Sequence, residues 1–123
     1  MVLYQRFYYF WVMIIKDEIK RRIPDFEALC RNHKVKYIYA FGSAVSDKFN
    51  AISSDIDLLV EIDEPDPLER GEYLLTLWDI FETRFQRKVD LLTESSIKNP
   101  YLKKSIDASK VLIYDRTSQK IPG

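Results

Sequence analysis

Hydrophobic positions along the chain switch between helical spacing and strand-like runs. Isoleucines recur at helical spacing among charged residues over 14–22, which predicts a short amphipathic helix, and a second helical stretch is predicted over 24–33. Residues 35–41 (VKYIYAF) are β-branched and aromatic, as is typical of a strand, and this strand stops at Gly42. A second strand is predicted over 55–62 (DIDLLVEI).

The second half of the chain repeats this alternation. The longest helix is predicted from about 68 to 87, because its apolar residues form one core-facing stripe. The stripe consists of Leu74, Leu77, Trp78, Phe81 and Phe85. A third strand over 87–93, a turn with a short helix, and a last strand over 111–114 follow. Helices that alternate with strands predict an α/β (α+β) fold, a mixed β-sheet flanked by helices.

Length and composition indicate one globular domain and exclude several classes of partner and location. It has 123 residues, 46% of them hydrophobic, and a formal net charge of zero. This balance favours neither a long nucleic-acid track nor an anionic membrane surface. One cysteine, Cys30, cannot form an internal disulfide framework. No stretch reaches the ~20 apolar residues of a membrane span. We therefore expect a reduced, cytoplasmic protein.

The first residues differ from the rest of the chain. Residues 1–13 are aromatic and apolar with a single charge, Arg6, and carry no signal-peptide cleavage pattern. They are either an apolar extension that packs on this domain or on a partner, or residues upstream of a natural start at Met13. The predicted organisation is this extension, a catalytic domain over 14–115 and a polar tail over 116–123.

Three aspartates stand in strands, where carboxylates are disfavoured. Asp55 and Asp57 are two residues apart, so the strand period places both on one face. Asp90 lies in the third strand, which could lie beside the second. Three converging carboxylates suit Mg²⁺, and a two-metal site for phosphoryl or nucleotidyl transfer follows from them.

A phosphate site is predicted at the end of the first strand. Gly42 allows the backbone to approach a phosphate closely, and the hydroxyl of Ser43 can add a hydrogen bond. If residues 44–49 open a helix, its N-terminal N–H groups would point at the anion.

These motifs resemble a known signature. The string FGSAVSDKFNAISSDIDLLV is similar to that of the polymerase-β-like nucleotidyltransferase superfamily: Gly-Ser, a spacer, then two aspartates one residue apart. The small size, the KVDLLT strand and the KVLIYD ending resemble its minimal nucleotidyltransferase (MNT) branch, whose members often accompany HEPN proteins in toxin–antitoxin pairs. The resemblance spans about residues 14 to 115.

The resemblance implies roles for these residues. Gly42 and Ser43 would hold the phosphates of ATP, Asp55 and Asp57 would bind Mg²⁺, and Asp90 would complete the metal site and help to deprotonate the attacking hydroxyl.

One departure from the family concerns the basic residue that many relatives carry shortly after Gly-Ser. Those positions are Ala44, Val45 and Ser46 in this chain. Either Lys48, the nearest cation, takes over the phosphate contact, or the nucleotide affinity is lowered.

Three functions remain open at this stage. The first is transfer of AMP to a hydroxyl of a partner protein, a HEPN-type toxin. The second is a non-catalytic antitoxin that binds nucleotide and neutralises its partner by direct contact. The third is nucleotidyl transfer to a small molecule or an RNA end. So small a domain must borrow its acceptor site from another chain, which predicts a homo- or hetero-oligomer, with no role for membranes and little for nucleic acid.

Overall fold

The computed structural model describes residues 13–42 and 55–117 of the chain. Residues 13–22 are helical, and the elements that follow are α2 (Phe26–Asn32), β1 (Val35–Phe41), β2 (Ile56–Ile62), α3 (Pro67–Phe85), β3 (Val89–Leu92), the short 3-10 helix η2 (Glu94–Ser96), α4 (Pro100–Ser109) and β4 (Val111–Asp115). The predicted order of elements is confirmed, with ends that differ by a residue or two. No helix in the described ranges is long and apolar enough to cross a membrane.

The four strands form one sheet in the order β3-β2-β1-β4. β1 pairs antiparallel with both β2 and β4, whereas β2 pairs in parallel with β3. A parallel pair needs a crossover connection between its strands, and α3 supplies it. The sheet is therefore mixed, as the sequence predicts, and β3 forms one of its edges.

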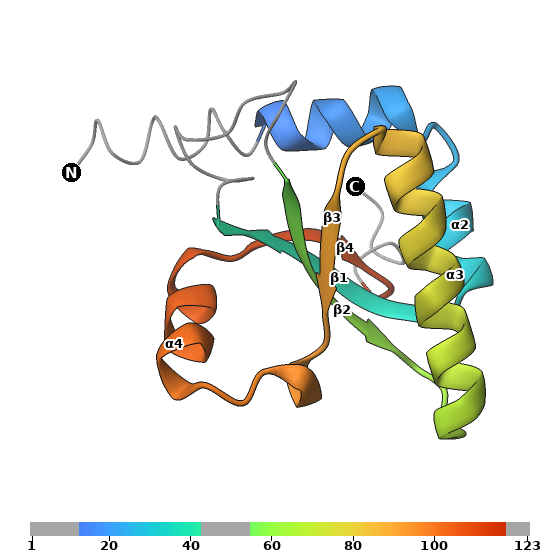
Figure 1. The fold of residues 1–123 in the computed structure, drawn as a ribbon. Helices are drawn as coiled ribbons and strands as arrows, with labels where there is room; N and C mark the ends of the chain where they lie inside the picture. Colours follow the sequence, from blue (N-terminus) through green and yellow to red (C-terminus); the bar gives the residue numbers. More distant parts are fainter. Residues whose placement is uncertain (1–12, 43–54, 118–123) are drawn as a thin grey trace.

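The two faces of the sheet are covered unequally. The helix over 13–22, α2 and α3 pack on one face and enclose the main core, whereas α4 lies on the other side (Figure 1). On that second face the buried side chains in contact are those of Phe41, Leu59 and Ile106. Successive strand residues point to opposite faces, so β2 contributes Leu58 and Val60 to the main core and Leu59 to the α4 side.

The ends of α3 follow from local chemistry. Asp66 caps the helix by accepting a hydrogen bond from the Leu68 N–H at 3.3 Å, and Pro67 occupies the first turn, where a missing N–H costs nothing. The helix ends at Phe85 because Gln86 adopts a left-handed φ of 55°. Leu77, Phe81 and Phe85 of the predicted stripe are buried, and Leu74 and Trp78 pack against the core while partly exposed.

A buried carboxylate ties the first helix to the start of β3. Glu18 is 6% exposed and pairs with Arg21 and Arg22 on its own helix, the latter at 3.0 Å. Arg87, which precedes β3, approaches the same carboxylate at 3.6 Å. This network fixes the chain just before the strand that carries Asp90.

We predict that Phe81→Ala lowers the free energy of unfolding by about 3–5 kcal/mol, because the ring is fully buried and stacks on Phe26 with centroids 5.9 Å apart. Urea denaturation followed by circular dichroism measures the change. Leu75→Ala on the same helix is the control; Leu75 is 66% exposed, and its loss is expected to change stability by less than about 0.5 kcal/mol. Equal losses in the two variants would contradict the placement of Phe81 in the core.

Candidate active site

Asp57 and Asp90 face each other across the parallel pair of strands. They are direct partners in the β2–β3 register, and each is partly buried. Val89 and Leu91 on either side of Asp90 point into the main core, which turns Asp90 to the α4 side of the sheet. The same alternation places Asp57 there, so the structure confirms that these two strands bring their aspartates together.

Asp90 perturbs the carboxyl group of Asp57. Burial, the negative charge of Asp90 and a side-chain hydrogen bond with Asp90 together raise the pKa of Asp57 to about 6, and the charge of Asp55 adds to the effect. Like charges this close are stable only when a proton or a cation lies between them. The ionised form of Asp57 is therefore disfavoured unless one of these neutralises it.

Asp55 lies at the rim of this pair. It is exposed, immediately before β2, and close enough for its charge to raise the pKa of Asp57. Within residues 13–42 and 55–117, no three His, Cys, Asp or Glu side chains are grouped tightly enough to hold a metal ion. The structure thus brings Asp57 and Asp90 together as a pair. Asp55 is close enough to act on Asp57 through its charge, but it does not form a compact triad with them.

Lys88 is a cation beside the pair that sequence reasoning missed. It is exposed, its carbonyl accepts a hydrogen bond from the Ile56 N–H at 3.1 Å, and its charge lowers the pKa of Asp57. The signal was available, because Lys88 precedes Asp90 by two residues and the strand period places both on one face.

Gly42 directly follows β1 and lies against the carboxylate of Asp57. Its φ of 64° is left-handed, and a Cβ built there would lie 2.6 Å from Oδ2 of Asp57. A residue with a side chain would therefore displace Asp57 as well as strain the turn. The other two predicted nucleotide-binding residues, Ser43 and Lys48, lie outside the described residues, as does the predicted turn over 44–49.

Asp57 and Asp90 bring two carboxylates together, and Oδ2 of Asp57 lies close to Gly42. Oxygen ligands of this kind are those that Mg²⁺ prefers.

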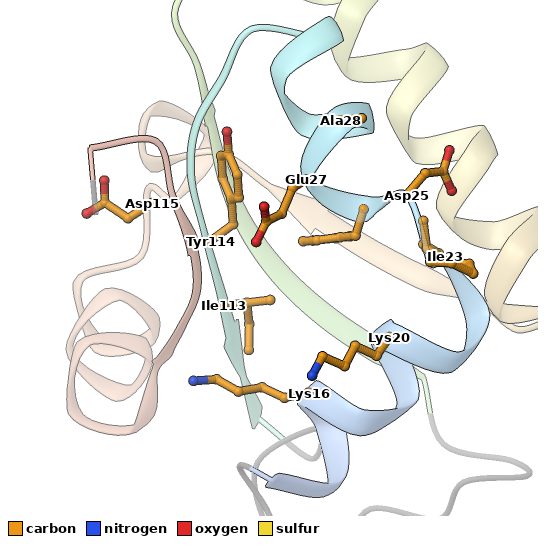
Figure 2. Close-up of a pocket in the computed structure, with 11 residues that line it drawn as sticks. Lys16, Lys20, Ile23, Asp25, Glu27, Ala28, Ile113, Tyr114 and Asp115 are labelled. Atoms are coloured by element: carbon orange, nitrogen blue, oxygen red, sulfur yellow. The ribbon is translucent and has the colours of Figure 1, made fainter. Parts of the chain in front are cut away.

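The described residues also form a cavity that is separate from the aspartate site. It measures 490 Å³ and lies among the first helix, α2 and β4, with Lys16 and Lys20 at one end and Glu27 and Tyr114 towards the other (Figure 2). None of the three aspartates lines it. The candidate chemistry is therefore at the strand ends on the α4 side of the sheet.

Paired carboxylates beside a glycine turn on a mixed sheet are typical of one class of protein, the enzymes of phosphoryl and nucleotidyl transfer. Comparison with known proteins narrows this class. A family model described as "Polymerase beta, Nucleotidyltransferase" matches residues 26–119. The chain belongs to this family and is a nucleotidyltransferase.

Two curated relatives come from Methanocaldococcus jannaschii, and each is named "Putative protein adenylyltransferase". One is 38% identical over 98 residues, which cover 79% of this chain and 96% of the relative. The other is 39% identical over 99 residues, which cover 80% of this chain and 94% of the relative. Both alignments span nearly the whole of the relatives.

Solved structures support the same fold. A structure described as that of a "putative minimal nucleotidyltransferase" is 26% identical with a TM-score of 0.54, over 79% of this chain and 93% of the other. A chain from a toxin–antitoxin crystal structure with AMP-PNP is 21% identical with a TM-score of 0.52, over 78% of this chain and 75% of the other. The resemblance to the minimal branch is confirmed, and the second likeness shows a common fold.

We predict that Asp57→Asn stabilises the cation-free protein more at pH 7.5 than at pH 4.5. The folded pKa of about 6 lies above the reference value of 3.8, so the ionised carboxylate costs stability above pH 6, and the cost fades as the pH falls. The gain at pH 7.5 is at most about 3 kcal/mol, since one pKa unit is about 1.4 kcal/mol. Urea denaturation in EDTA at both pH values measures it. Asp79→Asn, at an exposed position on α3, is the control. Equal gains for Asp57→Asn at the two pH values would refute the coupling.

We also predict opposite effects for two glycine substitutions. Gly42→Ala lowers the free energy of unfolding by about 1 kcal/mol or more, because of its left-handed φ and the contact with Asp57. Gly71→Ala, inside α3 with nothing within 4 Å of the new Cβ, raises it by about 0.5–1 kcal/mol. Thermal melts of the two glycine variants test these predictions. Unchanged stability of Gly42→Ala would show that the turn has room for a side chain.

Proposed function

We propose that this nucleotidyltransferase transfers AMP from ATP to a hydroxyl group of a partner protein, and that it depends on Mg²⁺. The observation that carries the proposal is the Asp57–Asp90 pair, two partly buried carboxylates in register on adjacent parallel strands. Such a pair is unfavourable as a structural element, because its charges repel and one of its pKa values rises. A functional cation accounts for it.

Asp57 and Asp90 would hold the Mg²⁺, and Asp55 would join them when the nucleotide brings its own oxygen ligands. Bound Mg²⁺ supplies positive charge that offsets the charge developing on the phosphate oxygens. Gly42 and Ser43 would lie along the phosphates, as the family resemblance implies.

Cations of the chain itself would complete the phosphate site. The basic residue that many relatives carry after Gly-Ser is absent from this sequence, and Lys48 is the nearest cation after that motif. Lys88 is a further candidate, because it directly precedes β3 and its charge lowers the pKa of Asp57. A lysine ammonium binds phosphate as a point charge and needs no fixed geometry.

In the proposed reaction the acceptor hydroxyl oxygen attacks the α-phosphorus of ATP. A bond forms between that oxygen and phosphorus, the bond from the α-phosphorus to the bridging oxygen breaks, and pyrophosphate leaves with the electron pair. Asp90 takes the hydroxyl proton and passes it to solvent.

The names of the relatives support a protein as the acceptor of the nucleotide. Both curated relatives carry the name of protein adenylyltransferases, which supports a protein acceptor and AMP as the transferred group. The fold shared with a toxin–antitoxin chain crystallised with AMP-PNP supports an adenine nucleotide and a toxin as partner. We propose a HEPN-type toxin as the acceptor and the cytoplasm as the compartment. The one cysteine, Cys30, has no second cysteine in the chain to pair with, which agrees with a reducing compartment.

We expect the purified protein, incubated with α-³²P-ATP and Mg²⁺ in an extract of its source cells, to label one protein band. Asp57→Asn and Asp90→Asn should each reduce the label by roughly 100-fold or more, since an amide lacks the charge that holds the cation. Asp79→Asn should label as strongly as the unaltered protein. Autoradiography gives the measurement, and mass spectrometry identifies the acceptor residue.

Other outcomes separate the competing functions. Label in a small molecule or an RNA, with none in protein, would replace the proposed acceptor. No label in any fraction, with toxin neutralisation unchanged in Asp57→Asn, would establish a non-catalytic antitoxin, the function favoured by the missing basic residue. Label that survives both aspartate substitutions would refute the assigned site.

A further inference from the structure

The backbone of Val89, next to Asp90, is held by side chains of α3. Its N–H donates to a carboxylate oxygen of Glu82 at 3.0 Å, and its carbonyl accepts from the indole N–H of Trp78 at 2.6 Å. The two side chains are four residues apart and so lie on one face of the helix. β3 is an edge strand, so the N–H and the carbonyl of Val89 that point away from β2 have no neighbouring strand to pair with. Glu82 and Trp78 satisfy both of these groups.

The opposite side of the same segment is fixed by the sheet. The Lys88 carbonyl accepts from the Ile56 N–H at 3.1 Å, and the Val89 side chain is fully buried in the main core. Lys88 and Val89, the two residues before Asp90, are therefore restrained together: β2 binds Lys88, α3 binds Val89, and the core encloses the Val89 side chain.

β3 needs this restraint because Asp90 lies opposite another carboxylate, that of Asp57. β3 is a four-residue edge strand, and its second residue opposes the carboxylate of Asp57 in register. Repulsion between the two charges favours a shift of the edge strand away from β2. A short edge strand has few ladder hydrogen bonds of its own to resist this shift.

We propose that Trp78 and Glu82 are positioning residues of the carboxylate site. They hold β3 so that Asp90 stays opposite Asp57, and in this way they set the affinity of the site for a divalent cation. The first part rests on the contacts of α3 alone; the second rests on the proposed function.

The first part is tested without metal by a double-mutant cycle. Trp78→Phe removes the indole N–H and keeps an aromatic ring, and Glu82→Met removes the acceptor and keeps the length. In EDTA at pH 7.5, Asp90→Asn should raise the melting temperature of the unaltered protein by about 5 °C, because it removes the repulsion. In the Trp78→Phe/Glu82→Met background the same substitution should raise it by less than half as much.

Equal shifts in the two backgrounds, or no shift in the unaltered protein, would overturn the proposal. If the double variant does not fold, the cycle is run with Trp78→Phe and Glu82→Met separately. Glu82→Gln keeps an acceptor oxygen and should preserve the full Asp90→Asn effect. Glu72→Met, at an exposed position on the same helix, controls for loss of a glutamate.

The second part is tested by Mn²⁺ binding, followed by electron paramagnetic resonance of the free ion. The Trp78→Phe/Glu82→Met variant should bind Mn²⁺ about 10-fold more weakly, the size of effect typical of residues that orient metal ligands. In an Asp90→Ala background the two substitutions should cause no further loss. Unchanged affinity in the double variant would overturn the positioning role. An unaltered protein that binds no Mn²⁺ would instead overturn the metal of the proposed function, while the melting cycle still decides the placement of Asp90.

Discussion

The juxtaposition of Asp57 and Asp90 is the constraint on which the rest of the structure depends. Two carboxylates in register on adjacent strands oppose folding, since their charges repel and part of each is buried. The pairing persists because the neighbours of both aspartates, Ile56, Leu58, Val89 and Leu91, are buried in the main core. Burial of these apolar side chains in the main core thus offsets the repulsion between the two carboxylates on the opposite face of the sheet.

Each surrounding element can be understood by its relation to this pair. The crossover helix α3 makes the parallel pairing of β2 and β3 possible, and its Trp78 and Glu82 hold the edge strand at Val89. β1 is followed by Gly42, whose missing side chain leaves room for the Asp57 carboxylate. α4 covers the middle of the same face through Ile106 and leaves the carboxylates partly exposed. A hydrophobic core on one side therefore supports an accessible charged site on the other.

The charge at the site is a local property of a chain whose formal net charge is zero. The chain carries equal numbers of acidic and basic residues, yet its aspartates gather at one end of β2 and β3 with Lys88 beside them. Local electrostatics, rather than the net charge, sets what the site attracts. Membership of the nucleotidyltransferase family agrees with this arrangement, because phosphate chemistry combines carboxylate-bound cations with nearby lysines.

The sequence by itself determined the element order, the mixed sheet and the three aspartates, since spacing of apolar residues and the period of a strand are local properties. It also indicated that Asp90 could meet Asp57. Only the tertiary structure decided their direct register, the contact of Gly42 with Asp57 and the hold of Trp78 and Glu82 on Val89. The spacing of Trp78 fits the core stripe, and its indole N–H gains a role only when α3 packs beside β3. Such contacts join residues distant in the chain, and no local pattern encodes them.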